Sequence, residues 1–441
     1  VQETEFSSAD YQKELAACLF EFYMGFWAPM LRCGDRTHQL GGGIGFQSMG
    51  YQKMYSSSGV HNRLESIGGH DYEYAHQYYS SADKRSHIRS FSFYLQDNWT
   101  LMNRLSITLG LRFDHVVGYI PAAKHLAVTS ALALGIGETI RTQYGFNPFA
   151  ENSTPAWENA MKWDSLSPRI GLTYDLFGDG KTALKASYAI YREAMPAMYY
   201  QGNHPFSQSQ WGWNPLRFRW WDTNGNGVPD SPTASTDVYQ LYAGNISDYN
   251  PDPAVYTAKI DPDTKAPQYN EIVLGVDHEL FAEFRVGAKY FYRERKNALD
   301  TVLYDKATGK PWYTAEKGGS WWVPYTTTVP AYGNYSASQV TVYFPSVGSP
   351  WLNRFNLFTN VEESTRQYSA FELTFDKRYS HGWTLGGSIV TSKTYGDNSG
   401  RAGSQHGFSG AYDNPNWFVN RLGRTDDDRP LAIKLYGAVE L

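Results

Sequence analysis

The chain has 441 residues and a formal net charge of -5 at pH 7, a length that suits several ordinary domains or one large barrel. The mildly acidic balance argues against a nucleic-acid partner, because nucleic-acid binding usually requires a basic patch. Aromatic residues make up 16% of the chain, with 34 Tyr and 14 Trp. Soluble enzymes rarely carry so many, whereas membrane β-barrels concentrate aromatic side chains at both membrane interfaces.

The first part of the chain, residues 1–36, follows no clear pattern. Its apolar stretch at 15–31 contains Glu21 and Pro29 and lacks a basic leader, so it fits neither a signal peptide nor a spanning helix. A poorly patterned pair of strands, or sequence altered near the end of a fragment, fits it at least as well, and we leave this segment unassigned. Cys18 and Cys33 lie here, and either a disulfide or two free thiols fits them.

The clearest structural signal is a strict alternation of apolar and polar residues at 104–114. Five apolar side chains fall on one face: Leu105, Ile107, Leu109, Leu111 and Phe113. Arg104, Arg112 and Asp114 fall on the other face. Alternation of this kind predicts a strand with two different faces, and about eleven residues is the length that a tilted strand needs to cross a bilayer.

Similar runs recur along the chain and predict about ten strands. They lie at 38–47, 90–99, 104–114, 169–176, 184–191, 272–276, 284–292, 371–376, 383–389 and 431–441. The connections between them alternate between short turns and long segments. The long segments lie at about 48–85, 115–167, 194–269, 296–367 and 394–429.

This sorting of connections predicts an all-β fold, a partial antiparallel transmembrane β-barrel with short periplasmic turns and long extracellular loops. A soluble propeller or sandwich is the alternative, but it leaves the two classes of connection unexplained.

Four segments resemble one family of outer-membrane proteins. They read RSFSFYLQDNWTLMNRLSITLGLRFDH at 89–115, SPRIGLTYDLFGDGKTALKASYAIYRE at 167–193, YSAFELTFDKRYSHGWTLGGSIVTSKTYG at 368–396 and DRPLAIKLYGAVEL at 428–441. Together they are similar to barrel hairpins of TonB-dependent receptors, in particular the Oar-like branch that bears a carboxypeptidase-regulatory-like domain.

The resemblance implies a location in the outer membrane of a Gram-negative bacterium and a barrel of about 22 strands closed by a plug. Residues 37–441 then correspond to an incomplete barrel domain, because neither a plug nor a terminal aromatic strand is visible. We therefore expect a piece of a longer protein that is not functional alone. Implied partners are outer-membrane lipid, the TonB complex through the missing plug, and a siderophore, oligosaccharide or peptide ligand.

Two other functions stay open beside energised uptake. One is a passive porin or a structural, adhesive surface barrel that needs no plug. The other is a soluble carbohydrate-binding β-protein. We expect no enzyme, because the sequence shows no nucleophile elbow, phosphate loop or zinc pattern and its 11 histidines are scattered.

A candidate calcium loop lies within the long segment 194–269. Its oxygen-bearing side chains are Asp222, Asn224, Asn226 and Asp230, and their spacing with an interposed Gly resembles the start of a calcium loop. Thr233 stands where a bidentate Glu is expected, so the set is incomplete. The alternative is an Asn/Gly turn whose side chains bond their own backbone.

The same segment is rich in aromatic and amide side chains, which suit a sugar or peptide ligand when exposed. The candidate ligand-binding residues are Tyr199, Tyr200, Trp211, Trp213, Trp220 and Trp221. We favour the alternative that these rings pack the loops against each other or lie at the membrane interface, and the same alternative applies to Trp321, Trp322 and Tyr325. Charges on the polar faces of the strands are interpreted as solvated wall charges or as contacts for a plug.

Overall fold

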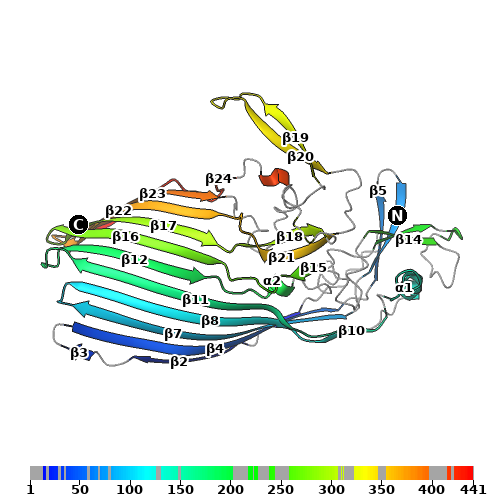
Figure 1. Ribbon diagram of the computed structural model, residues 1–441, viewed down its shortest axis with the longest axis horizontal. Coiled ribbons are helices and arrows are strands. Elements are labelled where there is room, and N and C mark those ends of the chain that lie inside the picture. Colours follow the sequence, from blue (N-terminus) through cyan, green and yellow to red (C-terminus); the bar gives the residue numbers. More distant parts are fainter. Residues whose placement is uncertain are drawn as a thin grey trace.

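The computed structural model describes residues 13–15, 19–27, 31–33, 36–56, 60–67, 70–77, 81–125, 131–147, 150–201, 217–221, 223–226, 238–243, 258–305, 309, 311, 322–345, 354–396, 415–418 and 422–440. Their main feature is one antiparallel sheet of 14 strands, in which each long strand pairs with the next long strand of the chain. Figure 1 shows these strands side by side. This is the all-β antiparallel architecture that the alternation predicts.

The long strands of this sheet form the wall. They are β4 (Arg36–Ser56), β7 (Ser81–Leu101), β8 (Leu105–Ile120), β11 (Trp157–Asp175), β12 (Thr182–Arg192), β16 (Gln268–Phe281), β17 (Phe284–Lys296), β22 (Arg366–Ser380), β23 (Trp383–Gly396) and β25 (Leu431–Val439). β24 (Gly423–Arg424) pairs with β23. Each of the ten predicted runs coincides with one of these strands, although Arg104, Leu176 and the last two residues of the chain lie just outside them.

The unassigned N-terminal segment also contributes to the sheet. Three of its strands, β1 (Lys13–Leu15), β2 (Leu19–Trp27) and β3 (Leu31–Cys33), pair with β4. β2 runs along the four glycines Gly41, Gly42, Gly43 and Gly45 of β4. Cys18 and the side chain of Cys33 lie outside the described part of the structure, and the choice between a disulfide and two free thiols stays a prediction.

The register separates two faces of the wall. One row across eight strands is apolar throughout: Leu105, Tyr174, Leu184, Val276, Ala288, Leu373, Ile389 and Ile433. The adjacent row on the opposite face reads Ser106, Thr173, Lys185, Gly275, Lys289, Glu372, Val390 and Ala432. We call these the outer face and the lumen face. A slip of one residue would exchange them, so the pattern fixes the register.

The short connections join neighbouring strands at one end of the wall, and the β11–β12 turn shows how they are built. Asp175 accepts hydrogen bonds from the backbone N–H groups of Gly178 and Gly180, both at 2.9 Å. Both glycines have a positive φ, which other residues rarely adopt. Arg104 donates from Nη2 to the carbonyl of Leu176 at 2.7 Å and so ties this turn to the β7–β8 turn. Arg104 is therefore a turn residue and not a charge on the lumen face.

The long connections lie at the other end and carry their own elements (Figure 1). These are β5 (Val60–Ile67), β6 (His70–Gln77), β9 (Ala123–His125), α1 (Ala131–Tyr144), β10 (Asn152–Thr154), α2 (Met198–Gln201), β13 (Arg217–Trp221), β14 (Val238–Ala243), β15 (Ala258–Ile260), β18 (Leu299–Asp305), β19 (Trp322–Val329), β20 (Ser338–Pro345), β21 (Arg354–Asn360) and the short helix Pro415–Phe418. Within the described part of the chain, no helix is long and apolar enough to cross a membrane.

Two loop limits predicted from sequence are wrong. The loop expected at 48–85 begins only after Ser56 and ends before Ser81, because β4 and β7 pair along 21 residues each. The loop expected at 115–167 likewise loses its ends to β8 and β11. Alternation stops where neither face has to be apolar, yet backbone pairing continues, so the sequence pattern underestimates strand length.

Candidate functional site

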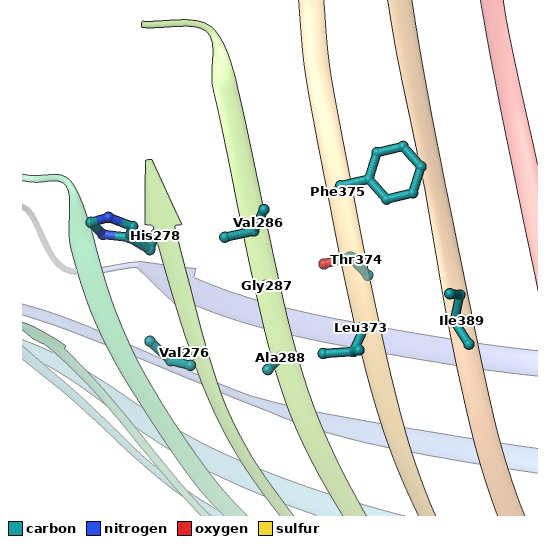
Figure 2. Close-up of a pocket in the computed structure, with 9 residues that line it drawn as sticks. All are labelled: Val276, His278, Val286, Gly287, Ala288, Leu373, Thr374, Phe375 and Ile389. Atoms are coloured by element: carbon teal, nitrogen blue, oxygen red, sulfur yellow. The ribbon is translucent and has the colours of Figure 1, made fainter. Parts of the chain in front are cut away.

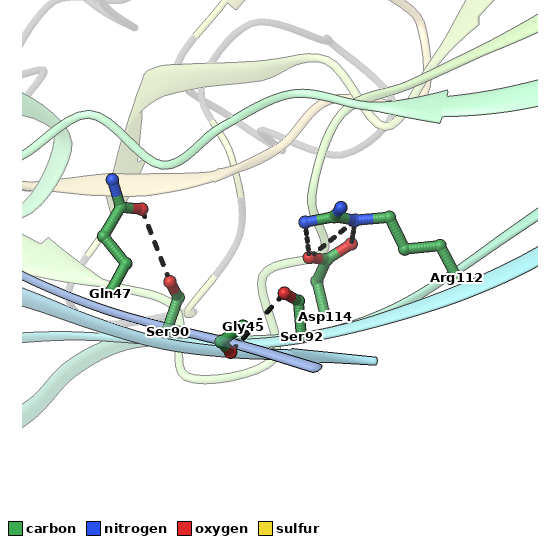
Figure 3. Close-up of polar contacts among 6 residues, drawn as sticks. All are labelled: Gly45, Gln47, Ser90, Ser92, Arg112 and Asp114. Carbon is green, nitrogen blue, oxygen red and sulfur yellow. Dashed lines mark hydrogen bonds and ion pairs between the residues drawn. The ribbon is translucent and has the colours of Figure 1, made fainter. Parts of the chain in front are cut away.

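We call the half of the lumen face nearer the short turns its lower part and the half nearer the long connections its upper part. The lower part is lined by polar side chains that interact with one another. Arg112 and Asp114 lie two residues apart on β8, and their side chains form a forked ion pair with Nη2–Oδ1 at 2.7 Å. Ser90 of β7 reaches the Gln47 side chain of β4 at 3.5 Å (Figure 3). These contacts cover the wall from β4 to β8 with paired polar groups.

The same arrangement continues along the wall. Lys185 of β12 contacts Asp277 of β16 at 2.6 Å, and Lys289 of β17 contacts Glu372 of β22 at 3.7 Å. Arg293 of β17 pairs with Glu271 of the neighbouring strand β16. Because cations and acids alternate, these charges neutralise each other and do not form a track of one sign. Such partly exposed pairs contribute at most about 1 kcal/mol each to stability.

The upper part of the lumen face is built differently. There the wall presents Ile88 of β7, Gly118 of β8 and Met161 of β11, which are register partners. Tyr200 of α2 packs onto this patch and is 0% exposed, and its hydroxyl donates to the carbonyl of His87 at 2.8 Å. A Cβ at position 118 would lie 2.5 Å from the Tyr200 ring, so Gly118 provides the space for it.

Tyr199 joins this patch to a second loop. Its ring lies 6.4 Å from that of Trp163 on β11 and 5.2 Å from that of Phe358 on β21, centroid to centroid. Its hydroxyl donates to the Glu193 carboxylate at 2.8 Å. Burial raises the pKa of both tyrosines, and for Tyr199 the Glu193 charge adds to the effect. The loops β12–β16 and β17–β22 are thus fastened to the lumen face of the wall.

The predicted aromatic residues therefore do not form one exposed surface. Tyr199 and Tyr200 are buried because α2 turns them toward the wall, which agrees with the favoured alternative that these rings pack the loops together. Trp221 of β13 is 44% exposed and belongs to a separate four-stranded sheet of β14, β13, β6 and β5. Trp220 lies on the same strand with an undescribed side chain, and Trp211 and Trp213 lie outside the described residues.

The candidate calcium loop is described only in part. The Asn226 N–H donates to Asn224 Oδ1 at 3.0 Å across Gly225, which has a positive φ of 71°. This is the local bond expected of an Asn/Gly turn. Asp222 and Asp230 lie outside the described residues, and among the residues that are described no three His, Cys, Asp or Glu side chains gather as metal ligands. The calcium site stays a prediction.

A cavity of about 360 Å³ lies on the outer face, between β16 and β23 (Figure 2). Its lining includes Val276, Ala288, Leu373 and Ile389 from one apolar row and Val286 and Phe375 from the next. Because these side chains belong to the outer face, the cavity opens away from the lumen and does not lie on a path through the wall.

Sequence patterns missed several elements that shape this site. Helices α1 and α2 lie in stretches expected to be loops, and Trp163, Met161 and Phe358 were not singled out. The apolar residues Met161 and Trp163 could have indicated the buried patch. They occupy odd-numbered positions of β11, which are not apolar further along the strand, at 169–175. Trp322 of β19 is buried, as packed rings require, whereas Tyr325 is 58% exposed and its ring lies 6.2 Å from that of Phe344. Trp321 lies outside the described residues.

Comparison with known proteins identifies the family to which this sheet belongs. A family model described as "Outer membrane beta barrel domain" matches residues 24–441. The chain belongs to this outer-membrane β-barrel family. It is a membrane barrel of the Gram-negative outer membrane and not an enzyme, so the soluble carbohydrate-binding alternative is wrong. The outer face of the wall is the one that faces lipid.

Among individual proteins, the chain is similar to "TonB-dependent transporter Oar" of Myxococcus xanthus, with 23% identity over 372 residues. That match covers 79% of this chain and 27% of Oar, so the chain is a distant, Oar-like relative that spans about a quarter of Oar. The resemblance noted from sequence is thereby confirmed.

Two solved structures are also similar in fold. The outer membrane transporter YddB from Escherichia coli matches with 13% identity and a TM-score of 0.49, covering 95% of this chain and 39% of YddB. The ferric-catecholate import receptor Fiu from E. coli matches with 10% identity and a TM-score of 0.38, covering 86% of this chain and 38% of Fiu.

Proposed function

We propose that the chain forms part of the barrel of a TonB-dependent transporter that takes up a large or scarce ligand. The observation that carries this proposal is the two-part lumen face. Its lower part is polar and charge-paired, whereas its upper part holds two extracellular loops packed against the wall. The similarity to Oar, named a TonB-dependent transporter, supports the same conclusion.

In this proposal the barrel domain expected at 37–441 also includes the N-terminal strands β1, β2 and β3 that pair with β4. The plug and the remaining strands belong to a longer protein. The paired charges of the lower lumen face then line the space next to the plug. The TonB complex acts through the plug and not through the wall. An open edge of a sheet is not tolerated in lipid, which supports the expectation of further strands.

For the ligand we propose the three classes expected from sequence: a siderophore, an oligosaccharide or a peptide. The exposed Trp221, together with Trp211, Trp213 and Trp220 of the same segment, supplies candidate stacking surfaces. Tyr199 and Tyr200 have a different role in this proposal, because they hold the loop that carries these tryptophans.

The test is uptake by cells that express the full-length protein, with and without a functional inner-membrane TonB complex. Labelled siderophores, oligosaccharides and peptides are supplied separately. We expect accumulation of one class only, and only in cells with TonB. TonB-independent accumulation of many small solutes would instead show a passive porin, and cell attachment without any uptake would show an adhesive barrel.

A further inference from the structure

Two small residues create the cavity on the outer face of the wall (Figure 2). Ala288 of β17 lies in one row with Val276 and Leu373, and it is the smallest residue of that row. In the next row toward the short turns, Gly387 of β23 is the register partner of Phe375. A Cβ at position 387 would lie 2.7 Å from the Phe375 ring, so this ring leans over Gly387 and away from β17. The space above Ala288 therefore stays open.

The cavity has the size of a ligand site, and its surroundings determine which ligand can enter. Its volume of about 360 Å³ lies within the range of roughly 300–1,000 Å³ that ligand pockets occupy. Apart from His278 and Thr374, the side chains that line it are apolar. Because the outer face meets lipid, the molecules that reach the cavity are the hydrocarbon chains of the membrane. A chain seated in a hollow contacts protein on several sides, whereas a chain on a flat face contacts it on one side only.

The position of the cavity along the strands indicates the leaflet from which the chain comes. His278 lies three residues before the end of β16 at Phe281, beside a short turn. Short turns of outer-membrane barrels face the periplasm. A chain in the cavity therefore belongs to a lipid of the periplasmic leaflet, and the headgroup of that lipid lies beside His278.

The residues at this end of the cavity suit a negatively charged headgroup. The His278 Nδ1 atom lies 2.9 Å from the Thr182 hydroxyl, which leaves Nε2 as the ring nitrogen for a ligand. Lys377 of β22 lies on the same outer face, and its ammonium donates to neutral oxygens of the following turn, the nearest at 2.7 Å. No acid pairs with Lys377 in the described part of the chain. The acids Asp277 and Asp376 belong to the lumen face, so they do not oppose an anion here.

We propose that the cavity is a binding site for a phospholipid of the periplasmic leaflet. One acyl chain fills the hollow above Ala288, and the phosphate group lies between His278 and Lys377. This lipid is bound at one place on the wall, unlike the lipid that surrounds the rest of the outer face. The site goes beyond the transport function, since a lipid held outside the wall does not pass through it.

The test uses the full-length protein in phosphatidylcholine vesicles that contain a small fraction of phosphatidylethanolamine with a photoreactive diazirine in one acyl chain. After illumination, mass spectrometry locates the labelled residues, and we expect the label to concentrate on β16, β17 and β22. Ala288→Leu fills the cavity. Ala186→Leu is the matched control, because it makes the same change on the outer face of β12, between Leu172 and Leu274 and outside the cavity.

We expect Ala288→Leu to lower labelling of these three strands about tenfold, the affinity equivalent of roughly two buried methylene groups. Ala186→Leu should leave the labelling unchanged. Heat-modifiable migration checks that both variants are folded. No TonB complex is present in the vesicles, so the result does not depend on transport.

The headgroup is tested with a diacylglycerol that carries the same photoreactive chain and lacks the phosphate. It should label the cavity strands less than the phospholipid does. His278→Ala should reduce labelling by the phospholipid to the level of the diacylglycerol, whereas His381→Ala, in the turn at the same end of the wall, should not.

The unmodified protein alone can overturn the proposal, whatever happens to the folding of the variants. Label that is spread evenly over the strands of the outer face would show ordinary boundary lipid and no site. Equal loss in Ala288→Leu and Ala186→Leu would show the same. Equal labelling by the phospholipid and the diacylglycerol would overturn the phosphate contact with His278 and Lys377.

Discussion

The lower and upper parts of the lumen face belong to the same strands, yet they are stabilised differently. On β8, Arg112 and Asp114 pair in an open, polar region, whereas Gly118, a few residues further along, lies under the Tyr200 ring. The lower part has solvent-screened ion pairs that contribute little to stability, and the upper part has a buried apolar cluster. The stability of the strands thus depends little on the ion pairs of the lower part, whereas in the upper part the strands pack against their loops.

Among the substitutions that test this comparison, Tyr200→Ala should have the largest effect. It removes a fully buried ring from the upper part, and we expect a loss of about 3–5 kcal/mol in the stability of the loop packing, as for other buried aromatic truncations. The measurement is limited proteolysis of the β12–β16 loop in detergent, followed by denaturant unfolding. Tyr200→Phe is the control, because it keeps the ring and loses only the bond to the His87 carbonyl, at a cost of about 1 kcal/mol.

On the outer face, Leu109→Arg places a charge against lipid. We expect a cost of about 2–4 kcal/mol at the membrane midplane and reduced assembly into the outer membrane, measured by heat-modifiable migration and membrane fractionation. Arg112→Leu, on the lumen face of the same strand, is the matched control and should assemble normally. Equal defects in the two variants would show that the two faces are wrongly assigned.

Alkaline pH provides a test of the upper cluster without mutation. Burial raises the pKa of Tyr199 and Tyr200, so their neutral forms contribute stability that is complete below the ordinary tyrosine pKa of about 10. This contribution is lost as pH rises through the raised pKa. Phenolate absorbance during titration should show a group of tyrosines that ionise late, and Tyr200→Phe should reduce this group by one.

The smallest expected effect concerns the predicted calcium loop, which belongs to neither part of the lumen face. If calcium binds at Asp222, Asn224, Asn226 and Asp230, chelation should speed proteolytic cleavage within 217–243 and leave the wall intact. Asp222→Ala should make cleavage insensitive to chelator. Identical cleavage with and without calcium in the unmodified protein would support the Asn/Gly turn in its place.

The sequence predicted the wall well because two faces in different surroundings impose a period of two on every strand. Leu105, Ile107 and Leu109 could be placed on one face from that period alone. The ends of the strands could not be predicted from that period, because β4 and β7 continue to pair where no alternation is required. The β2 strand was left open between a strand pair and other interpretations, because its own residues, LFEFYMGFW, do not alternate between apolar and polar.

The loop region was predicted less well, and α2 shows why. Whether Tyr199 and Tyr200 face solvent or protein depends on Gly118 and Phe358, which are distant in sequence and carry no local signal. A crowded aromatic segment is compatible with a binding surface and with a packed core alike.

The length of β4 and β7 has a consequence for where a ligand first meets the protein. A strand of 21 residues is about 70 Å long at roughly 3.3 Å per residue, and a tilt of about 40° leaves a height of roughly 50 Å, against an apolar band of about 25 Å. On this side of the sheet the strands therefore extend well beyond the apolar band of the membrane. In the transport function proposed above, a ligand would therefore first meet the protein at that height and not at the membrane surface.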